Sequence, residues 1–279
     1  MLVGRMGFEE EALKLFLTDS IEDAREITTK LNYFNRQRQE IEKKIFEDAI
    51  KQIEENNMDK DPVIIVSGED WHHGVIGIVS SKITDLYYKP SILICFDGES
   101  GKGSGRSISG FDLHNALCES SNYLEKFGGH EMAIGLSLEK KNFEDFKKKI
   151  TEIANKAKIE EFAPVLMIDK EIQTEDLTEE NVNSLQKLEP FGESNKTPVF
   201  LYKKLKIDSI RSLSEGKHLK LTLKDDNGNI VSAIGFNMGG LVEDYRLFDK
   251  VDIAGTLEIN EFNGRKEIQI NLKDIRKSL

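Results

Sequence analysis

The sequence has 279 residues, of which 38% are hydrophobic and 32% are charged, and its formal net charge is −11 at pH 7. This length predicts two domains with ordinary cores, the composition excludes a fibrous or collagen-like chain, and the charge excludes a surface that is basic throughout. Since we find no signal peptide and no apolar run near the ~18 residues of a membrane-spanning helix, we expect a cytoplasmic protein that does not bind membranes.

The first 57 residues have a helical pattern. Residues 9–17 form a short segment, and residues 20–57 form a long one without proline or glycine. Ser20, with Asp23 three positions later, is typical of a helix start. A helix of this length, about 50 Å at ~1.5 Å per residue, is either a connector between domains or an amphipathic core helix. The sequence leaves both interpretations open.

Residues 58–160 alternate between strand and helix patterns, which predicts an α/β domain with a mixed sheet. The expected strands are 62–67, 91–96 and the end of 128–138, and the expected helices are 74–88, 112–127 and 143–158. We interpret the glycine-rich segment 101–111 as a flexible turn. Cys95 and Cys118 are too few for a disulfide scaffold or a zinc site, so we expect reduced core thiols.

Strand patterns dominate the last part, 161–279. After a connector with a short helix at 178–188, we expect strands at 199–213, 217–224, 230–236, 250–259 and 266–275. The Asn-Gly pairs of DDNGN and EFNGRK are typical of hairpin turns. Five short strands with one short helix between the third and fourth predict a small barrel of the OB type, with another small antiparallel sheet as the alternative.

A first group of candidate binding residues is Gly103-Ser104-Gly105-Arg106-Ser107. Glycines let backbone N–H groups and a ligand approach closely, serines add hydroxyl donors, and the arginine guanidinium matches phosphate oxygens. The segment has no Walker pattern, which excludes a nucleoside-triphosphate loop. It predicts an oxyanion cradle, with an ordinary flexible hairpin as the alternative.

Gly128-Gly129-His130 is a second candidate group, at an expected turn between a helix end and a strand. The small residues around His130 would let a ligand approach its imidazole. The histidine can donate to phosphate or act in acid–base chemistry, or it can be an ordinary turn residue.

A third candidate is His72, in the sequence Trp71-His72-His73 before an expected helix. Helix N-termini favour anions, so His72 is a plausible phosphate donor. We do not expect a metal site from Asp70, His72 and His73, because adjacent histidines on a turn should point apart. Three groups that can donate hydrogen bonds to phosphate lie along one expected sheet, and together they predict an anionic, phosphodiester-like ligand.

Three motifs in this part resemble the DHH-associated domain of the RecJ family of single-strand-specific 5′→3′ exonucleases, in the DHH phosphoesterase superfamily: WHHGVIGIVSSKI, GKGSGRSISGFDLHNAL and FGGHEMAIGLSL. LEPFGESNKTPVF and the following strands resemble the RecJ OB domain. VGRMGFEEEALKLFL resembles the end of the catalytic DHH domain and its entry into a connecting helix. The resemblance covers essentially the whole chain and implies domain boundaries at 1–57, 58–160 and 161–279.

The resemblance also implies roles for single residues. Ser104 and Arg106 resemble the family's phosphate-binding pair near the 5′ end of the strand, and His130 resembles the residue that reaches the scissile phosphate. His72 and Arg5 fall on further positions expected to meet phosphate.

In that family the DHH domain binds two Mn²⁺ or Mg²⁺ ions through Asp and His residues. This sequence has no run of Asp and His that could hold such a pair, so we expect a C-terminal portion of a longer enzyme of DNA repair and recombination. We expect no metal bound by this chain and negligible nuclease activity from it alone. The expected partners are single-stranded DNA with a 5′ end and, beyond it, single-strand-binding protein and helicases.

Five residues of the expected barrel are candidates for stacking bases and holding phosphates: Lys217, Lys220, Phe236, Phe262 and Arg265. The alternation of Leu219, Leu221 and Leu223 with lysines predicts that Lys220 lies on the open face. Two other functions remain open, namely another DHH-type phosphodiesterase acting on short oligonucleotides or cyclic dinucleotides, and a non-catalytic single-strand-binding module.

Overall fold

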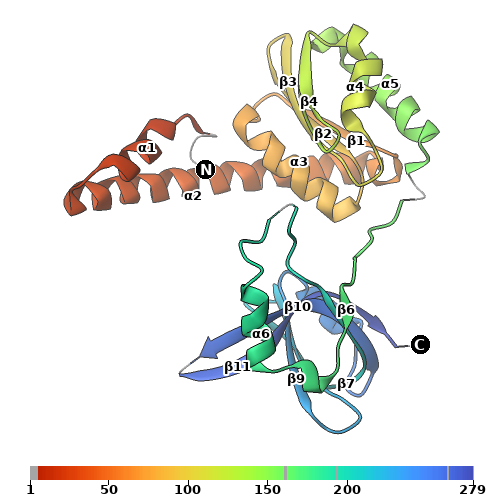
Figure 1. Ribbon diagram of the computed structural model, residues 1–279. Coiled ribbons are helices and arrows are strands. Elements are labelled where there is room, and N and C mark those ends of the chain that lie inside the picture. The colour runs from red at the N-terminus through yellow and green to blue at the C-terminus, as the bar shows by residue number, and fades with distance from the viewer. Residues whose placement is uncertain (1–5, 160–161, 193, 263, 279) are drawn as a thin grey trace. The chain divides into compact units, whose positions relative to one another are not determined.

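The structure is a computed structural model that describes residues 6–159, 162–192, 194–262 and 264–278. The chain divides into two compact units, with the boundary between Pro164 and Val165 (Figure 1). No helix in the described part of the chain is both long and apolar enough to span a bilayer.

The first unit begins with a helical hairpin of α1 (Glu9–Leu17) and α2 (Ile21–Glu55), which lie side by side in Figure 1. Ser20 caps α2 as predicted, because its hydroxyl accepts a hydrogen bond from the Asp23 amide at 3.2 Å. The C-terminal half of α2 buries Ile45, Ala49 and Ile53 in a hydrophobic cluster. This half is therefore a core helix.

A five-stranded mixed sheet follows, in the order β1-β2-β3-β5-β4. Its strands are β1 (Ile64–Gly68), β2 (Ser91–Asp97), β3 (Ser100–Arg106), β4 (Lys126–His130) and β5 (Ala133–Glu139). The helices around it are α3 (His73–Tyr87), α4 (Leu113–Glu119) and α5 (Phe143–Lys156), with 3₁₀ turns at Met58–Lys60, Ser121–Tyr123 and Lys140–Asn142. Only β1 and β2 are parallel, which confirms the predicted mixed sheet.

The two faces of this sheet are covered differently. One face packs against α4 and α5 through a cluster that includes Ile94, Leu136 and Phe146. On the other face, α2 and α3 pack against β1 and β2 through a cluster that includes Val66 and Leu93. On this second face β4 and β5 contribute no residue to that cluster, so their half of the face is available to a ligand.

Three sequence-based expectations for this unit are wrong. Residues 100–106 are the central strand β3 and not a turn, and residues 128–130 belong to β4. The helix predicted for 112–127 ends at Glu119, since β4 begins at Lys126. Cys95 is buried as expected, whereas Cys118 is exposed on α4.

The second unit is a small β-barrel with the predicted arrangement. Its strands are β6 (Lys170–Glu171), β7 (Phe200–Leu213), β8 (His218–Lys224), β9 (Ile230–Gly235), β10 (Lys250–Phe262) and β11 (Arg265–Lys277). Pairing of β10 with both β11 and β7 closes the sheet. Its helices are α6 (Glu179–Gln186) and two 3₁₀ turns, Thr174–Asp176 and, between β9 and β10, Gly239–Glu243. These elements confirm the OB-type barrel.

Candidate nucleic-acid interface

The glycines of β3 are required by packing. A Cβ atom at Gly103 would lie 2.8 Å from Leu136 Cδ1, and one at Gly105 would lie 2.8 Å from Ile134 Cδ1. Strand β3 also pairs with β2 on one side and with β5 on the other, so its amides bond within the sheet. The predicted backbone cradle at Gly103 and Gly105 is therefore wrong, because side chains from neighbouring strands close over these glycines.

The residues that alternate with these glycines along β3 have side chains on the opposite face of the sheet. Together with their neighbours on β5 and β4 they form what we call the platform. Residues directly opposite each other in a ladder share a face, and the pairings align three rows across β3, β5 and β4. The platform consists of the Arg106 row (Arg106, Ala133, His130), the Ser104 row (Ser104, Gly135, Gly128) and the Lys102 row (Lys102, Ser137, Lys126).

The middle row of the platform gives a ligand close access to the sheet. A Cβ atom at Gly128 would meet no atom within 4 Å, and one at Gly135 would meet only the Gly103 carbonyl oxygen, at 3.9 Å. Nothing in the packing therefore requires glycine at these two positions. Their lack of side chains leaves a smooth floor between two rows that carry cations and imidazole.

Arg106 and Ser104 lie together beside α3. The Arg106 Nη1 group donates to the Gly105 carbonyl at 2.7 Å and to the Ser104 hydroxyl at 3.4 Å. A Cβ atom at Gly77 of α3 would lie 2.9 Å from Ser104 Oγ, so the helix approaches this pair closely. The structure thus brings together the two residues predicted to bind phosphate.

His130 stands at the outer end of the Arg106 row and is exposed. Its Nδ1 accepts a hydrogen bond from the Met132 amide at 3.3 Å, which assigns the proton of the neutral imidazole to Nε2. The ring therefore presents an N–H donor. Gly129 beside it has φ of +137°, and a Cβ atom there would lie 2.2 Å from the Ala133 carbonyl oxygen, so the hairpin requires this glycine.

His72 caps α3, since its Nδ1 accepts a hydrogen bond from the Gly74 amide at 3.1 Å. Burial, and secondly the charge of His73, lower the pKa of His72. The two imidazole rings stack with centroids 5.1 Å apart, so the expectation that they point apart is wrong. The loop before them is held by a hydrogen bond of 2.9 Å from Trp71 Nε1 to Asp48 of α2.

Several sequence-predicted residues lie elsewhere. Ser107 is buried and its hydroxyl donates to the Phe111 carbonyl at 2.7 Å, so the prediction that it binds phosphate is wrong. Arg5 and the side chains of Phe262 and Arg265 lie outside the described residues.

Across the described ranges, no three His, Cys, Asp or Glu side chains are placed to hold a metal ion. The residues present therefore do not fit the pair of Mn²⁺ or Mg²⁺ ions that the sequence resemblance implies, and we derive no catalytic step from a metal.

The barrel contains a smaller set of candidates. Phe236 is 50% exposed, and its ring meets His218 edge-on at 5.2 Å, near the exposed Lys217. Lys220 is half-buried on the outer face, with Leu219 and Leu221 inside, as the alternation predicts. Its ammonium donates to the Ser232 hydroxyl at 2.7 Å, and burial lowers its pKa.

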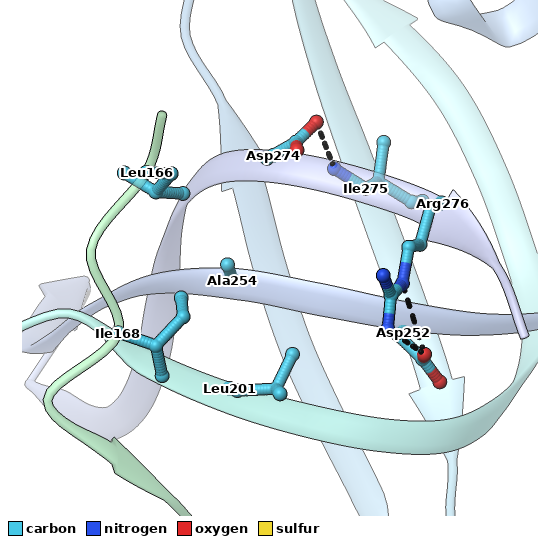
Figure 2. Close-up of a pocket in the computed structure, with 8 residues that line it drawn as sticks. All are labelled: Leu166, Ile168, Leu201, Asp252, Ala254, Asp274, Ile275 and Arg276. Carbon is cyan, nitrogen blue, oxygen red and sulfur yellow. Dashed lines mark hydrogen bonds and ion pairs between the residues drawn. The ribbon is translucent and has the colours of Figure 1, made fainter. Parts of the chain in front are cut away.

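A pocket of about 210 Å³ also lies in the second unit (Figure 2). Its walls carry Leu166, Ile168 and Leu201, and Asp252 lies at one end. That carboxylate already accepts hydrogen bonds from Arg276 at 3.2 Å and from Ser278 at 2.6 Å. The pocket is therefore an apolar recess next to a satisfied ion pair, and it offers less to phosphate than the platform does.

Two domain families match the chain: the DHHA1 domain over residues 60–156 and the RecJ OB domain over residues 168–274. The platform lies in the first of these ranges and the barrel in the second. Sequence analysis did not identify Lys102 and Lys126 of the platform as binding residues. The strand register places them on the platform, and this register is known only once 100–106 and 126–130 are known to be strands.

Whole-chain comparisons agree with the domain matches. The chain is 34% identical, over 98% of its length, to the single-stranded-DNA-specific exonuclease RecJ of Bacillus subtilis, and spans 35% of that relative. It is 29% identical to the RecJ of Thermus thermophilus and spans 38% of it. The crystal structure of Thermus thermophilus RecJ with Mn²⁺ matches all of the chain with a TM-score of 0.82 and 29% identity, over 40% of that structure. Residues 60–156 of the chain belong to the DHHA1 domain family and residues 168–274 belong to the RecJ OB domain family, and the chain as a whole is similar to part of the RecJ exonucleases.

Proposed function

We propose that this chain binds the backbone of single-stranded DNA through the platform, as the DNA-binding part of a RecJ-type 5′→3′ exonuclease. The observation that carries the proposal is the Arg106 row. It places a guanidinium and an imidazole N–H on one face of a sheet. The neighbouring Ser104 row has only one side chain, because its other two residues are glycines. Such a surface suits a polyanion that must approach the backbone closely.

Each residue has a distinct role in this proposal. Arg106 holds the phosphate nearest the 5′ end as a planar, bidentate donor, with its orientation set by the Gly105 carbonyl and the Ser104 hydroxyl. His130 donates from Nε2 to the scissile phosphate. His72, at the N-terminus of α3, and Arg5 are further phosphate contacts that follow from the family resemblance.

The barrel supports single-strand binding over the alternative of a phosphodiesterase for short oligonucleotides or cyclic dinucleotides, for which we expect no such tail. Phe236 offers a ring for base stacking, with Lys217 nearby. Association with single-strand-binding protein and helicases, and a cytoplasmic location, remain predictions from the sequence.

Hydrolysis is not assigned to the described residues. The homologous Thermus thermophilus structures contain Mg²⁺ or Mn²⁺, which supports metal use by the longer enzymes. Since the described residues offer no metal site, we propose that this chain by itself does not shorten single-stranded DNA. Shortening of a labelled oligonucleotide by purified chain with Mn²⁺, well above a buffer control, would contradict this.

Fluorescence anisotropy tests the binding proposal. A labelled, 5′-phosphorylated oligonucleotide is titrated with the chain, with Arg106→Ala and with His130→Ala, at several salt concentrations. We expect salt-sensitive binding that Arg106→Ala weakens about tenfold, since a hydrogen bond to a charged group is lost. An exposed lysine on the opposite face of the sheet, Lys148 of α5, provides the control Lys148→Ala. Equal affinities of Arg106→Ala and Lys148→Ala would reject the platform as the site.

A further inference from the structure

The Lys102 row carries two cations whose charges are not neutralised. Lys102 and Lys126 are exposed and flank Ser137 on the same face. Within the described part of the chain, neither ammonium forms an ion pair or a hydrogen bond. Some other lysines of this unit are paired, among them Lys82 with Glu42 at 2.5 Å, Lys140 with Glu69 at 2.6 Å and Lys141 with Glu139 at 2.5 Å.

The same row borders a surface hollow of about 390 Å³ between the start of α3 and strands β3, β5 and β4. His73 and Ile76 line its helical side, while Lys102, Lys126 and Ser137 line its sheet side. His73 and Lys102 also line a second hollow of about 500 Å³ at the N-terminus of α3. The two lysines thus face space that a ligand can enter.

The spacing separates this row from the Arg106 row. Lys102 and Arg106 are four residues apart on one strand, a distance of about 13 Å at ~3.3 Å per residue, which a single phosphate group does not bridge. Between them lies the glycine floor of the Ser104 row. Beyond Lys102 the next row, Asp97–Ser100–Glu139, carries carboxylates. The cationic surface therefore ends at the Arg106 row on one side and at the Lys102 row on the other.

We propose that the Lys102 row is a second phosphate subsite, which holds an internal phosphodiester of the strand whose terminal phosphate lies at the Arg106 row. This inference rests on the proposed function and adds to it the path of the strand. The DNA runs along β5, between the side chains of β3 and β4, over the glycine floor. Lys102 and Lys126 hold the internal phosphate from its two sides, and Ser137 donates its hydroxyl from below.

Single neutral linkages in the DNA test this path. A 5′-phosphorylated oligothymidylate is prepared with one methylphosphonate linkage, placed at each internal position in turn. Each probe is titrated with the unmodified chain, with Lys102→Ala, Lys126→Ala and Arg106→Ala, and with Lys148→Ala as the control. We expect one internal linkage whose neutralisation weakens binding to the unmodified chain more than it weakens binding to Lys102→Ala or Lys126→Ala, because each variant has already lost one contact to that phosphate. Each lysine variant should also reduce the slope of log affinity against log salt by roughly 0.7, the value for one contact to a single strand.

The outcomes separate the two proposals. If Arg106→Ala weakens binding while Lys102→Ala and Lys126→Ala match Lys148→Ala at every linkage, the second subsite is wrong and the platform proposal stands. If the unmodified chain fails to bind at low salt, or Arg106→Ala also matches Lys148→Ala, both proposals are overturned. Retention of the salt slope in both lysine variants likewise rejects the subsite.

Discussion

The platform and the barrel both present lysines from the outer faces of strands, but the lysines have different surroundings. On the platform, Lys102 and Lys126 have no ion pair with the described residues. On the barrel, Lys203 pairs with Glu171 at 2.6 Å, Lys224 pairs with Asp208 at 2.7 Å, and Lys220 bonds to a serine hydroxyl.

This difference matters because the chain is acidic as a whole. A cation that is already paired contributes little to binding a phosphate, since the new contact replaces an existing one. Lys102 and Lys126 lie on one face of the sheet on either side of Ser137, where their fields act together and locally. We infer that the platform supplies most of the electrostatic affinity and that the barrel contributes mainly through aromatic stacking.

The largest effect is expected at the two adjacent glycines of β4. Gly129→Ala places a Cβ atom 2.2 Å from the Ala133 carbonyl oxygen at a φ of +137°, so it should destabilise the first unit by about 2–4 kcal/mol. The Cβ atom of Gly128→Ala meets no atom within 4 Å, so this variant should keep its stability. Its methyl group would project from the platform where the DNA backbone is proposed to approach, so DNA binding should weaken. Thermal unfolding and DNA titration of both variants measure the contrast. Equal stabilities would show that the hairpin geometry differs from the structure.

The next effect concerns stacking on the barrel. Phe236→Ala removes a half-exposed ring and should weaken single-strand binding by about 1 kcal/mol, at the lower end of the range for one stacked base. This loss should change little with salt, because no charge is removed. Phe248→Ala is the matched control, since Phe248 is 65% exposed and contacts Lys206. Equal losses in the two variants would remove Phe236 as a specific stacking site.

A smaller effect is expected at Lys220, which tests the comparison directly. Lys220→Met removes a cation that burial and the Ser232 hydroxyl already hold in place. Ser232 keeps a second partner in Gln269 at 3.4 Å. Binding should therefore fall by less than about 0.5 kcal/mol, against about 1.4 kcal/mol for Lys102→Ala. A loss at Lys220 as large as at Lys102 would contradict the assignment of the cationic surface to the platform.

The sequence predicts the elements of this molecule better than it predicts the faces of its strands. Hydrophobic alternation and turn residues place the strands from β7 to β11 within three residues of the structure, because the buried leucines of β8 and the Asn-Gly turns act locally, whereas the short strand β6 is not predicted. The long helix is predicted for the same reason, since Ser20 caps it and no glycine or proline interrupts it.

The misplaced segments are those rich in glycine. Local preferences favour a turn for 100–106, but Ile94, Leu136 and Ile134 come from other strands to fill the space that the glycines leave. Such tertiary packing is not visible in a local pattern. The resemblance still selects Arg106, Ser104 and His130, which the register then brings onto one face. The residue chemistry of the glycine-rich segment also selects Ser107, although that hydroxyl turns inward to Phe111.

The last expected effect is the pH dependence of the cap at His72, which concerns stability and not affinity. Burial lowers the pKa of His72, and the charge of His73 lowers it further, so the folded state favours the neutral imidazole. A depressed histidine pKa contributes stability that is complete above the unfolded value of about 6.5 and is lost as pH falls through the folded value. Protonation of Nδ1 would also break its hydrogen bond with the Gly74 amide.

His72→Asn tests this because asparagine is a good N-cap and does not titrate. The free energy of unfolding of the unmodified chain should fall between pH 7 and 5 relative to that of His72→Asn, by less than about 1 kcal/mol because solvent screens a partly exposed ring. His73→Asn should reduce the fall, since it removes the second cause of the shift. Parallel pH profiles of the unmodified chain and His72→Asn would show that His72 does not hold the cap in its neutral form.

If the profiles diverge as expected, the platform and the neighbouring N-terminus of α3 differ in the charge of the groups that contact phosphate. Arg106 and the lysines would act as permanent cations, and His72 would act as a neutral Nε2–H donor whose charge appears only as the cap weakens.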